Sequence, residues 1–67
     1  MEPKLQAQAF YLQDALSNYF KGNYAVSIAL CKVVLVLDSK NVSAKELLQN
    51  AELALNKVQN LTVNDTE

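Results

Sequence analysis

The sequence predicts an all-α protein built around one small core. One Gly and one Pro in 67 residues leave few positions for tight hairpin turns. Apolar residues recur at steps of three and four, which is the period of an amphipathic helix. A chain of this length buries only about 60% of the surface that its unfolded form exposes, so we expect a single domain.

The first helix is expected over residues 3–21. Pro3 suits the first turn of a helix, where its missing N–H costs no hydrogen bond. Gly22 is the expected C-terminal stop, because glycine readily adopts the left-handed conformation that ends a helix. Between these two residues lies an apolar stripe: Leu5, Ala9, Leu12, Leu16 and Tyr19.

The second helix is expected over residues 24–37, with Asn23 as its N-cap. Its many valines favour strands, but strict alternation is absent, and about 14 residues is long for a strand. A reversal of only two or three residues places the first two helices side by side and antiparallel.

The third helix is expected over residues 44–59. Ser43 and Glu46 have the spacing of a capping box, and Val42 and Leu47 have that of a hydrophobic staple. The stripe expected to pack inward consists of Leu47, Leu48, Ala51, Ala54, Leu55 and Val58. Residues 60–67 are polar and acidic and are predicted to form a disordered tail, so the domain is assigned to residues 1–59.

The amino-acid composition argues against catalytic and metal-binding sites. The chain has no His and one Cys, so Cys31 lacks metal co-ligands and an activating imidazole, and we expect it to be a small buried hydrophobe. We therefore expect no enzyme, no catalytic residue, no metal and no cofactor. Six scattered lysines and no arginine argue against nucleic acid and membrane partners. The N-terminus lacks the pattern of a signal peptide, so an intracellular, cytoplasmic location is expected.

The sequence contains more apolar surface than three packed helices can bury. The segment 24–37 is apolar nearly all round, whereas two neighbours cover about two thirds of a helix. Either some of this surface meets another chain, or one side of the helix simply faces water; that side would consist of Ala25, Ser27, Ala29 and Lys32. Phe10 and Leu53 also fall on the polar sides of their own helices, where single exposed apolar residues are common.

Residues 8–41 resemble one tetratricopeptide repeat. The matching features are Lys21-Gly22-Asn23-Tyr24 at the turn, Ser27-Ile28 in the second helix and Leu35-Val36-Leu37-Asp38 near its end. The resemblance implies an array in which an antiparallel hairpin is capped by a third helix. The family's usual turn would place Asp14 and Asn18 inward; a turn one residue shorter agrees better with the periodicity and places Leu12, Ala15, Leu16 and Tyr19 inward.

In that register the resemblance implies a concave partner-binding face shared by the first and third helices. Its candidate residues are Phe10, Gln13, Ser17 and Phe20, with Ser43, Glu46, Asn50 and Leu53 opposite. These positions lack the lysine–asparagine set that clamps chaperone tails, so an apolar peptide or partner helix is the expected ligand of an adapter module.

Two alternatives stay open. The turn and the Ala51-Glu52 pair also resemble a microtubule-interacting and trafficking domain, which would bind a helix between its second and third helices. The surplus apolar surface could instead serve a structural role, as a homodimer formed through the second or third helix.

Overall fold

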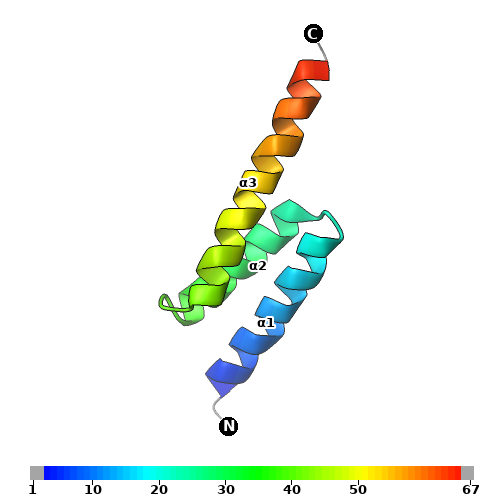
Figure 1. Cartoon of the computed structure of the whole chain (residues 1–67). Helices are drawn as coiled ribbons and strands as arrows, with labels where there is room; N and C mark the ends of the chain where they lie inside the picture. Colours follow the sequence, from blue (N-terminus) through cyan, green and yellow to red (C-terminus); the bar gives the residue numbers. More distant parts are fainter. Residues whose placement is uncertain (1–2, 66–67) are drawn as a thin grey trace.

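The computed structural model describes residues 3–65, with side chains described for residues 5–59. It contains three helices, α1 (Pro3–Phe20), α2 (Tyr24–Leu37) and α3 (Val42–Asp65), and no strand within the described range. Figure 1 shows α1 and α2 as an antiparallel hairpin, with α3 packed along α2 and extending past the hairpin. The predicted all-α fold, a hairpin with a third helix that caps it, is confirmed.

Gly22 ends α1 as predicted. Its φ of 86° lies in the left-handed region that glycine adopts without strain. The Gly22 N–H donates to the carbonyl of Tyr19 at 3.0 Å, and the Asn23 N–H donates to that of Asn18 at 2.8 Å. This is the Schellman arrangement, which satisfies two carbonyl groups at the end of the helix.

Asn23 occupies the N-cap position of α2, but its side chain does not cap the helix. The side-chain amide of Asn23 donates to the side-chain oxygen of Asn18 at 3.3 Å instead. The predicted capping role of Asn23 is therefore wrong, because a partner on the end of α1 is within reach of the same side chain.

Small residues lie where α1 and α2 pack against each other. Ala15 of α1 and Ser27 of α2 are both fully buried, and the Ser27 hydroxyl donates to the carbonyl oxygen of Ala15 at 2.8 Å. Ser27 therefore does not belong to a solvent-facing side of α2. Ala25, Ala29 and Lys32 of that proposed side are exposed.

Asn41, and not Ser43, is the N-cap of α3. The Asn41 side-chain oxygen accepts a hydrogen bond from the Ala44 N–H at 3.0 Å, and its backbone carbonyl accepts one from Lys45 at 3.2 Å. Ser43 lies within the first turn and is exposed, as is Glu46. The predicted capping box is replaced because asparagine caps at least as well as serine and stands two residues earlier.

α3 is longer than predicted. It continues to Asp65, so the expected end at residue 59 and the disordered segment 60–65 are corrected; residues 66 and 67 of the predicted tail lie outside the described range. The radius of gyration is 13.5 Å and the longest dimension is 53 Å. A compact chain of this length would have a radius of gyration of about 11 Å, so the long third helix dominates the shape.

One residue from each helix forms the centre of the core. Ala15, Cys31 and Leu47 are buried together, and side chains from all three helices pack around them: Leu12, Tyr19, Leu30 and Leu48. Burial raises the pKa of the Cys31 thiol above its ordinary value near 9.0, and a hydrogen bond with Ser27 partly offsets this rise. Cys31 is thus the small buried hydrophobe that was predicted.

The stripe predicted for α1 is partly wrong. Ala15 is fully buried, and Leu12 and Tyr19 pack on the core as expected, but Leu5, Ala9 and Leu16 are exposed. Gln8 is buried in their place, where its side-chain oxygen accepts a hydrogen bond from the Asn41 amide at 3.1 Å. In α3 the predicted stripe is inward except for Val58, which is about half exposed.

Candidate interaction surface

The two apolar residues singled out on polar helix faces are both exposed. Phe10 is 68% exposed on α1 and Leu53 is 64% exposed on α3. Neither is required to fill the core, so both side chains are accessible to a partner. The ring of Phe10 contacts only the edge of the neighbouring Tyr11 ring among the aromatic pairs of the described residues, with centroids 5.7 Å apart.

Phe10 borders a shallow hollow on α1 of about 300 Å³. The residues that line this α1 hollow follow a helical spacing of three and four, so they share one face: Phe10, Gln13, Asp14 and Ser17. The structure therefore brings together three of the predicted site residues and adds the carboxylate of Asp14.

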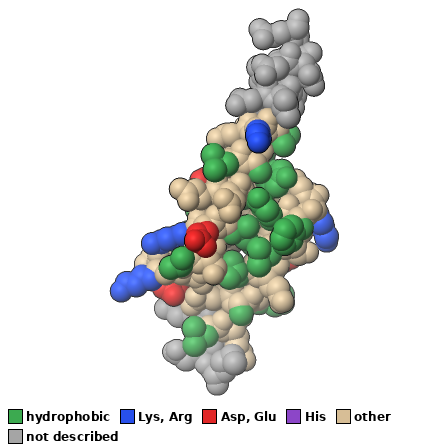
Figure 2. All heavy atoms as spheres, viewed as in Figure 1, with side chains coloured by type: hydrophobic (Ala, Val, Ile, Leu, Met, Phe, Trp, Pro, Cys, Tyr) green, Lys and Arg blue, Asp and Glu red, His purple; other side chains and the backbone are tan. Residues whose placement is uncertain are grey.

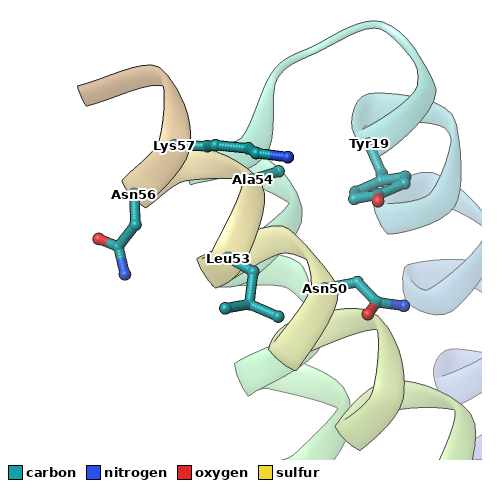
Figure 3. Close-up of a pocket in the computed structure, with 6 residues that line it drawn as sticks. All are labelled: Tyr19, Asn50, Leu53, Ala54, Asn56 and Lys57. Atoms are coloured by element: carbon teal, nitrogen blue, oxygen red, sulfur yellow. The ribbon is translucent and has the colours of Figure 1, made fainter. Parts of the chain in front are cut away.

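Leu53 borders a larger hollow of about 570 Å³, between the C-terminal end of α1 and the middle of α3. This α1/α3 hollow is lined by Tyr19, Asn50, Leu53, Ala54, Asn56 and Lys57. Figure 3 shows the Lys57 ammonium group and the Asn50 amide reaching toward the side of Tyr19, whereas Asn56 points away. The lining of the hollow thus combines apolar side chains with a phenol, amides and a cation.

Phe20, Ser43 and Glu46, the remaining predicted residues, line neither hollow. All three are exposed, and the rings of Phe20 and Tyr19 make a T-shaped contact, with centroids 5.7 Å apart. Phe10 and Leu53 border different hollows, so the two residues on which the predicted shared face depended are not brought together in one cavity.

Sequence reasoning missed Tyr19, Ala54, Asn56 and Lys57 as lining residues of the α1/α3 hollow. Tyr19 was assigned to the core stripe, and its ring does pack on the core and against the edge of Tyr24, with centroids 5.5 Å apart. The helical spacing of Asn50, Leu53 and Lys57 already placed Lys57 on the same face of α3. That spacing is the signal that would have extended the predicted site.

Hydrophobic side chains are exposed on the face of the molecule that Figure 2 shows. Figure 2 shows hydrophobic side chains gathered over the centre of the molecule, where α1 and α3 lie on either side of α2.

Within the described residues, no three His, Cys, Asp or Glu side chains are close enough to hold a metal ion together. Over the same residues, no helix combines the length and hydropathy needed to cross a membrane.

Comparison of the chain with protein-family models, curated proteins and solved structures finds no match.

Proposed function

We propose that this chain is a non-enzymatic protein–protein interaction module, an adapter that binds a peptide or partner helix by apolar contacts on the face of α1 and α3. The proposed contact residues on α1 are Phe10, Gln13, Ser17 and Phe20. Those on α3 are Glu46, Asn50 and Leu53, joined by Lys57 and by Tyr19 from the end of α1.

The α1/α3 hollow is the observation that carries this proposal. Leu53 and Ala54 are its apolar lining residues, and the hollow is large enough to receive an apolar side chain of a partner. Burial of one exposed Leu or Phe side chain contributes about 1.5–3 kcal/mol, so covering Leu53 and Phe10 would provide a substantial part of the free energy of binding. A partner whose anchor fills the hollow would also cover part of the Tyr19 ring.

The position of the larger hollow supports a repeat-like module over a trafficking-type domain. A trafficking-type domain would bind its helix between α2 and α3, whereas this hollow lies between α1 and α3. Self-association through α2 or α3 is the structural alternative. Sedimentation at tens of micromolar distinguishes the two roles, because an adapter that works as a single copy remains a monomer.

Replacement of Leu53 tests the proposal. Leu53→Ala and Phe10→Ala are each expected to weaken capture of the same partner by about tenfold or more, since each removes apolar contact area at the interface. The measurement is quantitative affinity capture with the folded chain as bait. Helicity by circular dichroism should not change, because both side chains are exposed.

Val42→Ala is the matched control. Val42 is an exposed apolar residue on α3 that lines neither hollow. Equal loss of capture in Val42→Ala and Leu53→Ala would mean that general surface hydrophobicity, and not the α1/α3 face, retains the partner. Loss of helicity in Leu53→Ala would instead assign that residue to the core.

A further inference from the structure

The side of α2 that faces away from α1 and α3 carries a second apolar surface. Six of its residues are exposed and fall within one arc of the helix: Ala25, Val26, Ala29, Lys32, Val33 and Val36. Val36 is 85% exposed, Val26 49% and Val33 40%. This set, called the outward face of α2, lies opposite the buried line of Ser27, Cys31 and Val34.

The spacing of the outward face fits another helix. Val26, Ala29, Val33 and Val36 follow steps of three, four and three, which is the spacing of the seam in paired helices. Ala25 and Ala29 are small and allow a second helix axis to approach closely. Exposed β-branched residues at these positions have restricted side-chain rotamers, so they lose little entropy when a partner covers them.

The charge of this face selects among possible partners. α2 contains Lys32 and no acidic residue, and among the described residues no carboxylate forms an ion pair with the Lys32 ammonium group. Lys32 stands near the middle of α2, so antiparallel pairing of two copies would bring two like charges together with no acid on either α2 to offset them.

The outward face is also only about 21 Å long and about 10 Å wide. Two copies meeting through it would bury less than the about 1,200 Å² of a stable dimer.

We propose that the outward face of α2 binds an acidic amphipathic helix of a partner protein, with apolar residues on the valine seam and a carboxylate beside Lys32. This surface is separate from the α1/α3 face, so the chain can hold two partners at once. An interface of this small area binds weakly. Because it includes a charge contact at Lys32, its affinity falls as the salt concentration rises, which suits a reversible contact.

Two synthetic helical peptides test this inference. Both carry Leu at seam positions; one has Glu and the other has Lys at the flanking positions. Fluorescence anisotropy should show that the acidic peptide binds about three- to tenfold more tightly than the basic one at low salt. Lys32→Glu should reverse this order. Val36→Ser should weaken binding of the acidic peptide several-fold, because it removes apolar contact from the seam.

Leu5→Ser is the matched control, since Leu5 is an exposed apolar residue on α1. It should leave binding of the acidic peptide unchanged. Equal affinity for both peptides, or binding that is unaffected by Lys32→Glu and Val36→Ser, would overturn the proposal. A concentration-dependent dimer that Val36→Ser abolishes would also overturn it, because a second copy would then occupy the face. None of these outcomes depends on the α1/α3 hollow.

Discussion

Ser27 is the residue at which side-chain size and hydrogen bonding both determine how closely α1 and α2 pack. The helices approach at Ala15, and the Ser27 hydroxyl donates to the Ala15 carbonyl oxygen, which has a second lone pair besides the one used within α1. A larger side chain at position 27 would push the two helices apart. The sequence left open that Ser27 lies on a water-facing side of α2, because the acceptor 12 residues away becomes visible only when the helices are packed.

Substitutions at Ser27 should therefore separate volume from hydrogen bonding. Ser27→Ala is expected to lower the free energy of unfolding by about 1 kcal/mol through loss of the hydrogen bond. Ser27→Leu is expected to lower it by more, about 1–3 kcal/mol from overpacking alone. Urea denaturation followed by circular dichroism measures both. Ser17→Ala, at an exposed position of α1, should stay within about 0.5 kcal/mol of the parent.

At the scale of the secondary-structure element, the start of α3 depends on one residue, Asn41. Asn41 caps the helix through its side-chain oxygen and donates through its amide to the buried Gln8 side chain of α1. One side chain thus fixes both where α3 begins and how it meets α1. The capping box predicted at Ser43 had the right spacing, but spacing cannot choose between two neighbouring cap candidates when both are good ones.

Asn41→Ala should lower the free energy of unfolding by about 0.5–2 kcal/mol, because the Ala44 N–H loses its cap and Gln8 loses its partner. Ser43→Ala should change it by less than about 0.5 kcal/mol. Thermal and urea unfolding compare the two variants directly. A larger loss in Ser43→Ala would restore the capping box and contradict the assignment of Asn41. Gln8→Ala separates the contribution of the interhelical bond from that of the cap.

The whole molecule is asymmetric because α3 is much longer than its neighbours. With 24 residues α3 spans about 36 Å, whereas the 14 residues of α2 span about 21 Å. Figure 1 shows the C-terminal part of α3 running past the hairpin. Helical turns without tertiary packing add little stability, since most helical stability in proteins comes from a packed apolar face.

Truncation after Gln59 should therefore leave the fold intact. We expect the free energy of unfolding to fall by less than about 1 kcal/mol, while the helical circular dichroism signal decreases by the share of residues 60–65. Chemical denaturation and far-ultraviolet spectra of the full and truncated chains measure these two quantities. Cooperative loss of α1 and α2 on truncation would show that the end of α3 supports the hairpin.

The sequence by itself determined the number and order of the helices, the glycine stop at position 22 and the excess of apolar surface on α2. These follow from local rules: the period of the apolar residues, the φ that Gly22 alone adopts easily, and the scarcity of polar residues between 24 and 37. It also identified Phe10 and Leu53 as exposed apolar residues.

Only the tertiary structure decided which polar side chains are buried and which residues meet at a surface. Gln8 and Ser27 are inside because each finds a hydrogen-bond partner on another segment, and a polar group is buried at low cost only when such a partner is present. Tyr19 and Lys57 lie 38 positions apart in the chain and line one hollow because α1 and α3 both pack on α2. Contacts between residues that are distant in the sequence leave no periodic pattern in it, so only the packing of the helices determines which residues meet.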